Sequence, residues 1–525
     1  MTDHVFTIDL GTSGPKVALF TIEGDYVDGA FRPVDLVLGA GGAVEQRPAD
    51  WWAGIVAGAQ ELAARRAIDP SSIVAVSVTS QWSGTVAVDA ASEPLADAII
   101  WMDSRGAAAT KRLVGGPVKI AGYDPRKLRA WIKYTGGAPA HSGKDPISHI
   151  AWIESERPEL AARTAKYLEP KDWLNARLTG RVVATYDSIV VHWLTDNRDP
   201  VRVAYVDELI ARSGVPRAKF PDLIAATDVV GPLRDDVAIE LGLPPGIPVI
   251  GGTPDVQSAA IGSGAVRDGE GHLYIGTSSW ITCHVSYKKT DLQRGIASLP
   301  SPLPGKYFVA DEQETAGKCL EFLRDHILWP VDALGTPGPP DDAWARIDAL
   351  AATAPPGANG VMFTPWLVGE RTPVDDHTLR AAWSNVDIGT TRADLARAVL
   401  EGVALNTRWL LESVEKFTGT PFPWLHFIGG GAVSSLWAQI IADVLQREMR
   451  VVANPVRANA RGAALLAALA LGHTTVDEIA RTVPIAATYT PTPANAALYD
   501  ERYTAFRAFH KANKRIYRTM NGHDR

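Results

Sequence analysis

Residues 9–16 read "DLGTSGPK", a glycine-rich turn between two apolar segments. Residues 4–8 ("HVFTI") precede it and residues 17–22 ("VALFTI") follow it. Both flanks are rich in β-branched and aromatic residues and are too short for helices, which predicts a strand, a tight turn and a second strand. A P-loop or a dinucleotide-binding turn needs another glycine spacing and a following helix, and neither is present. If this turn binds phosphate, it does so through backbone N–H groups and the hydroxyls of Thr12 and Ser13.

A similar pattern returns in the second half of the chain. Residues 272–285 read "HLYIGTSSWITCHV", which again predicts a strand, a Gly-Thr-Ser turn and a strand. Two copies of one device suggest two related domains that each present a hairpin, although a three-residue match also arises by chance. A boundary near "GIPVIGG" (residues 246–252) fits this repeat. We therefore expect an N-terminal domain over residues 1–249 and a C-terminal domain over residues 250–525.

The coarse secondary structure supports two such domains. Residues 392–419 predict a long amphipathic helix that ends at Gly419, and residues 424–452 predict a strand, a glycine turn, a helix and a strand. Helices and strands alternate in both halves, which is typical of an α/β fold whose sheets are covered by helices.

Composition bounds the function classes. The chain has 525 residues, which is too long for one core, and a net charge of -7 without a basic block, which argues against nucleic-acid and anionic-membrane partners. Cys283 and Cys319 lack metal-ligand spacing and favour a reduced, intracellular protein. The first residues resemble no signal peptide and no stretch reaches membrane-spanning length, so we expect a cytoplasmic protein.

Asp9 lies at the end of the first predicted strand, where a carboxylate is costly to bury without a cation or donors around it. Beside a phosphate-binding turn it could hold Mg²⁺ directly or through water, and Lys16 could add positive charge for the same phosphate. The alternative is a capped hairpin in which Asp9 bonds the amides of its own turn. The residues alone leave both interpretations open.

Asp255 lies in "IGGTPDVQSAAIGSG" (residues 250–264), at the end of a predicted strand and in the first turn of a predicted helix. The helix dipole favours an ionised carboxylate there, and such a group could accept a proton from a hydroxyl. A plain charge at a helix N-terminus is the commoner reason for an aspartate in this place.

Two more stretches could bind ligands. Three glycines separate a strand from a helix in "FIGGGAVSSLWAQIIADV" (residues 427–444), which favours a ligand at the helix N-terminus. "SVTSQWSG" (residues 77–84) and "IIWMDSRG" (residues 99–106) place polar groups and a tryptophan after apolar strands, as carbohydrate pockets do. Surface turns with an incidental tryptophan explain residues 77–84 and 99–106 equally well.

Taken in order, these motifs resemble the FGGY carbohydrate kinases over nearly the whole chain. The resemblance rests on "IDLGTSGPK", "WMDSR", "EPKDWLNARLTG", "GTPD", "YIGTSS", "GERTP" and "IGGGAVSSLWAQIIADVL". It implies an α/β fold of two related actin/Hsp70/hexokinase-type (ribonuclease H-like) domains with a cleft between them. It also implies ATP and Mg²⁺ as cofactors.

The resemblance also implies residue roles. Asp255 would be the general base and Asp9 part of the metal site. The other implied residues are the first phosphate site (Gly11, Thr12, Ser13, Lys16), the second phosphate site (Gly276, Thr277, Ser278), the adenosine site (Gly430, Gly431, Ala432, with Ser435 nearby) and the sugar site (Gln81, Trp82, Ser83, Trp101, Asp103, Asp255).

The branch that the chain resembles most is the xylulokinases, with departures. Their sugar strand typically carries Gln-Met-His-Gly, whereas this chain has "SQWSG", with Trp82 and Ser83 in place of Met and His. The catalytic turn, usually glycine-rich, carries Thr253 and Pro254, and His149 stands where a lysine is common. The first two departures concern the sugar pocket, so they leave the identity of the sugar open rather than the reaction.

We therefore expect an ATP-dependent carbohydrate kinase that transfers the γ-phosphate of MgATP to a hydroxyl of a small sugar, a pentulose such as D-xylulose. The alternatives are a kinase for another ketose or a linear polyol, such as ribulose or a tetritol, and a sugar or nucleotide sensor without catalysis. Retention of Asp9, Asp255 and both Gly-Thr-Ser turns argues against the sensor. The expected partners are the sugar or polyol and MgATP, with no nucleic acid and no membrane, and a homodimer is left open.

Overall fold

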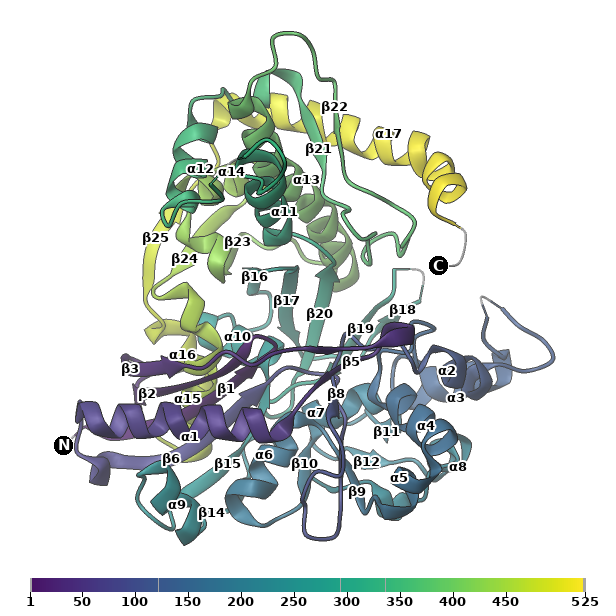
Figure 1. Cartoon of the computed structure of the whole chain (residues 1–525), viewed down its shortest axis with the longest axis vertical. Coiled ribbons are helices and arrows are strands. Elements are labelled where there is room, and N and C mark those ends of the chain that lie inside the picture. Colours follow the sequence, from purple (N-terminus) through teal and green to yellow (C-terminus); the bar gives the residue numbers. More distant parts are fainter. Residues whose placement is uncertain (1, 121, 293, 336, 523–525) are drawn as a thin grey trace.

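The computed structural model describes residues 2–120, 122–292, 294–335 and 337–522. Within these residues the chain forms two α/β lobes, one above the other in Figure 1, each built around a mixed sheet. The lower sheet has the order β14-β15-β6-β1-β2-β3 and the upper sheet the order β18-β19-β20-β17-β16-β23-β24-β25. The lower strands are β1 (His4–Gly11), β2 (Gly14–Thr21), β3 (Tyr26–Phe31), β6 (Ile73–Ser80), β14 (Val229–Pro232) and β15 (Pro248–Pro254). The upper strands are β16 (Gly271–Ile275), β17 (Ser279–Val285), β18 (Thr290–Asp291), β19 (Ile296–Pro300), β20 (Tyr307–Gln313), β23 (Trp424–Ile428), β24 (Glu448–Val452) and β25 (Ile485–Tyr489).

The two sheets repeat one arrangement. In the lower sheet β3, β2 and β1 are antiparallel neighbours, and β6 and β15 continue parallel to β1. In the upper sheet β20, β17 and β16 are antiparallel, and β23 and β24 continue parallel to β16. The predicted hairpins are therefore confirmed, and they occupy the same place in both sheets. We call β1–β2 the first hairpin and β16–β17 the second hairpin.

The sheet pairing places the change of lobe later than the expected boundary between residues 249 and 250. That position falls inside β15, which pairs with β6 and β14 in the lower sheet. Gly251 and Gly252 lie at an irregularity within the strand, where the register with β6 shifts between Ile250 and Thr253. The chain enters the upper sheet only at β16, after helix α10 (Asp255–Ser263).

Helices cover both sheets. Helix α1 (Pro48–Arg65) packs on β2 and β3 and buries Trp51 and Ile55 against the lower sheet. The predicted long helix of the upper lobe is α13 (Arg392–Thr418), which begins with a capping box between Thr391 and Asp394 and ends at Gly419 in the left-handed conformation. It packs on α14 (Ser435–Leu445) beside the sheet. A helical region with its own core lies beside the lower sheet and comprises α2 (Ala107–Val114), α3 (Pro125–Tyr134), α4 (Pro146–Glu156), α5 (Pro158–Arg163) and α8 (Asp207–Ser213).

Two crossing helices join the lobes. Helix α15 (Ala458–Ala470) follows β24 of the upper sheet but packs on α10, β1 and β6. Glycines permit the close crossing, because a Cβ on Gly262 would lie 1.8 Å from the Ala458 oxygen and a Cβ on Gly462 would lie 1.8 Å from the Ser258 oxygen. The buried guanidinium of Arg461 donates to backbone oxygens of both lobes, including those of Gly24 and Ala453.

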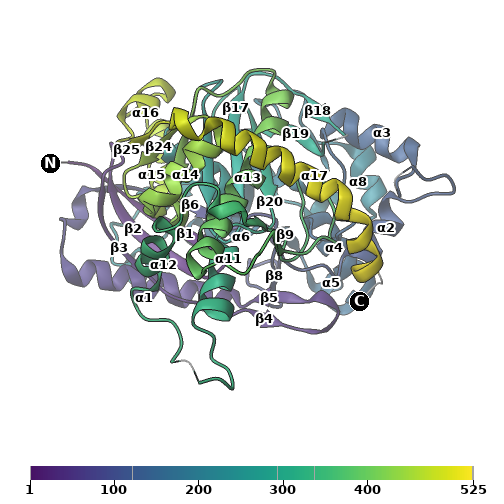
Figure 2. The ribbon, with the colours of Figure 1, turned by 90° about the horizontal axis from the view of Figure 1, so that it is seen from above.

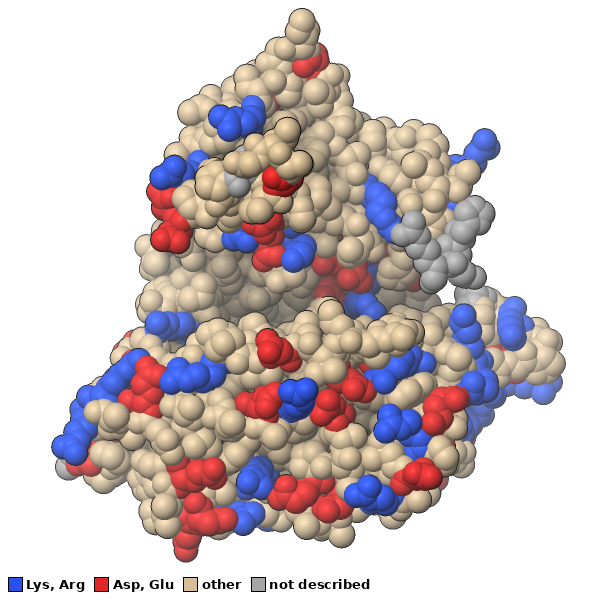
Figure 3. Space-filling view, in the orientation of Figure 1, with Lys and Arg blue, Asp and Glu red and all other residues tan. Residues whose placement is uncertain are grey.

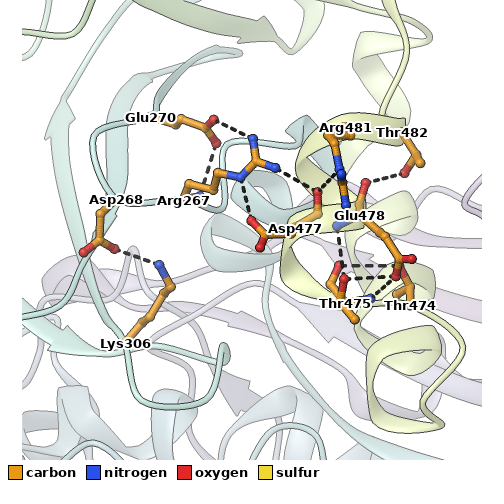
Figure 4. A network of polar contacts seen from close by, with 10 residues as sticks. All are labelled: Arg267, Asp268, Glu270, Lys306, Thr474, Thr475, Asp477, Glu478, Arg481 and Thr482. Atoms are coloured by element: carbon orange, nitrogen blue, oxygen red, sulfur yellow. Dashed lines mark hydrogen bonds and ion pairs between the residues drawn. The ribbon is translucent and has the colours of Figure 1, made fainter.

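Surface contacts hold the segment that connects α10 to β16. Arg267 donates from Nε to Asp477 Oδ1 at 2.8 Å, and Lys306 donates to Asp268 at 2.7 Å (Figure 4). Asp477 belongs to α16 (Val476–Thr482), which packs beside this segment. The final helix α17 (Ala496–Asn521) lies across the upper lobe (Figure 2). Among the described residues, helices that combine the length and the apolar character needed to cross a membrane are absent.

Candidate active site

Asp255 is the first residue of α10, directly after β15. Its half-buried carboxylate accepts a hydrogen bond at Oδ1 from the backbone N–H of Val256 at 2.8 Å. Burial and then the negative charge of Asp9 raise the pKa of Asp255 to about 7, and the Val256 amide and Lys16 oppose the shift. A carboxylate that titrates near neutral pH suits a group that takes a proton from a hydroxyl.

The first hairpin brings Asp9 to the same place. Asp9 is 3% exposed and lies opposite Lys16 in the ladder, with 3.4 Å between Asp9 Oδ2 and Lys16 Nζ. Its Oδ1 atom is buried and has no hydrogen-bond partner among the described residues. An anionic oxygen left bare beside a second carboxylate, that of Asp255, needs a cation. These oxygens fit Mg²⁺, which uses one or two protein carboxylates together with phosphate oxygens.

Thr12 links the first hairpin to the predicted sugar residues. The Thr12 hydroxyl accepts a hydrogen bond from Trp101 Nε1 at 3.0 Å and lies 3.4 Å from the side-chain oxygen of Gln81. Gln46, which the sequence did not single out, donates to the Thr12 carbonyl at 2.7 Å and accepts from Gln81 at 2.8 Å. Ser13 stands exposed at the tip of the turn. The predicted phosphate and sugar residues therefore meet here.

The remaining predicted sugar residues differ in how many hydrogen bonds they already make within the protein. Trp82 donates from Nε1 to the Ser188 carbonyl at 3.0 Å, and Ser83 has a left-handed φ of 62°. Asp103 is fully buried, and its two oxygens accept from the backbone N–H groups of Val44 and Arg105 and from the Arg105 guanidinium. A direct contact between Asp103 and a sugar would have to displace one of these bonds.

The second hairpin closes with a three-residue loop of Gly276, Thr277 and Ser278. The Gly276 N–H donates to the Ser278 carbonyl at 2.9 Å, and the Ser278 hydroxyl accepts from Trp280 Nε1 at 3.2 Å. Thr277 is exposed. The loop therefore presents a hydroxyl and backbone to solvent, without an ionisable group of its own.

The glycines after β23 have separate roles. A Cβ on Gly431 would lie 2.7 Å from the Ile275 side chain, so this glycine lets the turn pack against the end of β16. A Cβ on Gly430 would meet nothing within 4 Å, so only this one of the two faces open space. Ala432 is buried and Ser435 is exposed at the start of α14. The expected contact surface for a ligand therefore narrows to Gly430 and Ser435.

The sequence did not single out Glu312, a charged residue of the upper lobe that acts on Asp255. Glu312 on β20 is buried and forms an ion pair with Arg371, which also pairs with Glu314 at 3.2 Å. Burial raises the pKa of Glu312 to about 7, and its charge adds to the upward shift in the pKa of Asp255. The "GERTP" motif contains Arg371 and was the available signal.

Figure 3 shows a hollow between the two lobes, with acidic and basic side chains inside it. The lower sheet, which carries the first hairpin and β15, and the upper sheet, which carries the second hairpin, belong to the two lobes on either side of this hollow (Figure 1). Groups of three or more histidine, cysteine, aspartate or glutamate residues that could hold a metal by themselves are absent from the described part of the chain.

Comparison with known proteins identifies the architecture. The model of the N-terminal domain of the FGGY family of carbohydrate kinases matches residues 4–262, and that of the C-terminal domain matches residues 272–471. The chain belongs to this family. It therefore has the two-domain, actin-like α/β fold of the FGGY kinases.

The relatives of this FGGY kinase differ in substrate. A xylulose kinase from Staphylococcus epidermidis is 26% identical over 98% of this chain and 97% of its own length. A gluconokinase from Bacillus subtilis is 24% identical over 90% of this chain and 88% of its own length. The crystal structure of a xylulose kinase from Lactobacillus acidophilus superposes with a TM-score of 0.85 at 22% identity and covers 99% of this chain and 100% of that one.

Proposed function

We propose that the protein transfers the γ-phosphoryl group of MgATP to a hydroxyl of a small neutral sugar, with a ketopentose such as D-xylulose as the first candidate. The carboxylate of Asp255 carries this proposal. It stands at a strand-to-helix junction beside the first hairpin, with a pKa raised to about 7. Such a group can accept the hydroxyl proton as the phosphoryl group is transferred.

In this proposal each part of the site has one task. Asp255 orients the hydroxyl and takes its proton, and Thr12 and Ser13 hold phosphate oxygens from the lower lobe. Gly276, Thr277 and Ser278 hold them from the upper lobe, and Gly430 lets the nucleoside approach. Holding the hydroxyl in line with the γ-phosphate accounts for most of the rate, since effective molarity is worth about 7–11 kcal/mol.

Asp9 is the residue proposed to hold Mg²⁺, with Asp255 nearby. Its bare, buried Oδ1 atom supports this assignment. Bound with the nucleotide, the ion would neutralise charge on the phosphate oxygens. Lys16 pairs with Asp9 across the ladder, so it brings a positive charge that can also attract the same phosphates.

The charges around the site favour a neutral acceptor over an acidic one such as gluconate. The negative charges of Asp9 and Glu312 both raise the pKa of Asp255, so each of them repels the charged form of that carboxylate. Arg371 and Lys16 are already paired with carboxylates. A substrate carboxylate would add a fourth negative charge without an evident partner among these residues.

The first experiment measures ADP release with MgATP across ketopentoses, ketotetroses, linear polyols, glycerol and gluconate, beside Asp255→Asn. We expect one neutral ketose with high kcat/KM whose turnover is lost in the variant. Preferred turnover of gluconate would contradict the charge argument. Preference for a tetritol or another ketose would instead follow from Ser83, which replaces the histidine expected in xylulokinases.

Absence of any acceptor above the background ATPase would leave the sensor interpretation. Isothermal titration of the same compounds then separates the two outcomes. A sugar that binds tightly without turnover supports a sensor, and a panel without binding means that the acceptor lies outside the compounds tested.

A further inference from the structure

A lysine is fully buried against β15, the strand that ends directly before Asp255. Lys171, near the start of α6 (Pro170–Thr179), is 1% exposed. Its Nζ atom donates to the Gly251 carbonyl at 3.0 Å and to Asp172 Oδ1 at 2.5 Å. One turn later Asn175 donates from Nδ2 to the same Gly251 carbonyl at 2.7 Å. Two buried donors thus converge on one backbone oxygen of β15.

The Gly251 carbonyl belongs to a bulge in β15, four residues before Asp255. Ile250 pairs with Ser77, but the next pair is Thr253 with Thr79, so the strand gains a residue within this interval. Gly252 has a φ of 72°, and a Cβ there would lie 2.0 Å from the Val78 oxygen. A carbonyl turned out of the ladder in a buried place needs other donors, and Lys171 and Asn175 supply them.

A second arm of the network reaches the strand closer to Asp255. Asp187, on α7 (Tyr186–Ile189), accepts a hydrogen bond at Oδ2 from the Thr253 hydroxyl at 2.5 Å. Burial raises the pKa of Asp187, and the Lys171 cation opposes this shift. The lysine therefore balances two buried carboxylates, Asp172 and Asp187, while it holds the bulge.

The same network extends to the predicted sugar pocket. Asp172 Oδ2 accepts from the Ser188 hydroxyl at 2.6 Å, and the Ser188 carbonyl accepts from Trp82 Nε1 at 3.0 Å. Helices α6 and α7 both pack on β15. One buried cation thus lies between the strand that carries Asp255 and the tryptophan expected to face the sugar.

We propose that Lys171 is a positioning residue for phosphoryl transfer, which fixes the β15 bulge and so the place of Asp255 relative to the sugar. The proposal rests on the proposed function of Asp255 as the proton acceptor. It acts through geometry, since a displacement of about 1 Å in a reacting group costs on the order of 10²-fold in rate.

The test replaces Lys171 with methionine, which keeps an unbranched side chain, one atom shorter than that of lysine, and removes the donor. Lys166→Met is the matched control, because Lys166 also donates to a backbone carbonyl of the lower lobe, that of Phe220 at 2.9 Å, and lies on a strand, β9 (Lys166–Leu168), that pairs with β7 (Val86–Val88) rather than with β15. We expect kcat of Lys171→Met to fall about 10²-fold, with a raised KM for the sugar, an unchanged KM for ATP and a shifted acid limb of the pH–rate profile. Lys166→Met should match the wild type in all four.

Asn175→Ala removes the other donor to the Gly251 carbonyl. If both donors act through that oxygen, the double variant Lys171→Met/Asn175→Ala should lose little more activity than Lys171→Met alone. Multiplied losses in the double variant would refute this route. Wild-type kcat and pH profile in Lys171→Met, with only a lower Tm, would reduce the lysine to a structural role. Should Lys171→Met fail to fold, Asn175→Ala alone decides, with wild-type kcat as the refuting result.

Hydrogen exchange separates this inference from the proposed function. Backbone amides of residues 250–253, 255 and 256 should exchange faster in Lys171→Met and Asn175→Ala than in the wild type, and not in Lys166→Met. This readout needs no substrate, so it stands even if no sugar of the panel is turned over. Unchanged exchange in Asn175→Ala and Lys171→Met would overturn the positioning role whatever the wild-type activity.

Discussion

The two hairpins share a backbone and differ in charge. Each lies between an antiparallel neighbour and a parallel neighbour in its own sheet, with a turn that contains Thr and Ser. Near the turn, the first hairpin pairs Asp9 with Lys16, whereas the second pairs Tyr274 with Trp280. The repeated arrangement therefore keeps the place of the turn, while only the first hairpin places a carboxylate and an ammonium group beside it.

This difference in charge suits the two hairpins to different roles in the proposed reaction. The first hairpin is charged and lies beside Asp255, so it suits the reacting groups and the metal ion. The second is neutral and crowded, because a Cβ on Gly276 would lie 2.2 Å from the Tyr274 hydroxyl. It suits contacts from the backbone to phosphate. The comparison predicts that charge changes matter at the first hairpin and that steric changes matter at the second.

The largest effect is expected from Asp255→Asn, which keeps the shape of the side chain and removes the base. We expect kcat to fall about 10²–10⁴-fold with nearly unchanged nucleotide affinity. Asp235→Asn is the matched control, because Asp235 is likewise the first residue of a helix, α9 (Asp235–Leu241), but is exposed. Near-normal turnover in Asp255→Asn, or equal losses in both variants, would leave only the helix-charge interpretation of Asp255.

The next effect tests the charge on the first hairpin. We expect Asp9→Asn to lower activity about 10²-fold, as when one preorganised electrostatic group is lost, and to raise the Mg²⁺ concentration needed. Since Asp9 raises the pKa of Asp255 and Lys16 lowers it, the acid limb of the pH–rate profile should move to lower pH in Asp9→Asn and to higher pH in Lys16→Met. Tyr274→Phe, on the second hairpin, should leave this limb in place. Shifts of the same sign in the first two variants would contradict the assignment.

Local sequence predicted the hairpins and the helix ends because their causes are local. Flanks rich in β-branched and aromatic residues, together with the turn residues, indicate β1–β2 and β16–β17, and Gly419 ends α13 in the left-handed conformation. Local sequence does not distinguish glycines in a turn between domains from glycines in a strand bulge, such as Gly251 and Gly252. Only the pairing of β15 with β6 distinguishes them.

The site residues that sequence missed depend on long-range contacts. Arg371 and Glu312 are 59 positions apart, and Lys171 is 80 positions from Gly251. Neither distance leaves a trace in local periodicity. In the sequence Lys171 reads as an ordinary helix lysine, and its burial appears only when α6 packs on β15. Asp103 also makes a long-range contact that local sequence does not indicate, because it accepts a hydrogen bond from the backbone of Val44 as well as from Arg105.

A smaller effect is expected on the KM for ATP when a glycine of either turn is replaced by alanine. Gly276→Ala should raise the KM for ATP about tenfold, because the added Cβ displaces the Tyr274 ring against the phosphate loop. Gly11→Ala should change it less, since its Cβ would lie 3.4 Å from Lys16 Nζ and 3.8 Å from the Gly14 oxygen. Steady-state kinetics with varied ATP measures both. A larger rise in the KM for ATP in Gly11→Ala than in Gly276→Ala would contradict the proposal that steric changes matter more at the second hairpin.

The smallest effect is on stability and also concerns the charged hairpin. The pKa of Asp255 is raised from 3.8 to about 7 in the folded protein, so the folded state binds the proton more tightly than the unfolded state. Stability contributed by that proton is present below pH 4 and is lost as the pH rises to about 7. Asp255→Asn removes the penalty, so its Tm should exceed that of the wild type by a few degrees at pH 8 and by less at pH 5. Asp235→Asn, exposed at its own helix start, should show no such pH-dependent gain. A gain that persists unchanged at pH 5 would mean that shape rather than the charge beside Asp9 destabilises this end of β15.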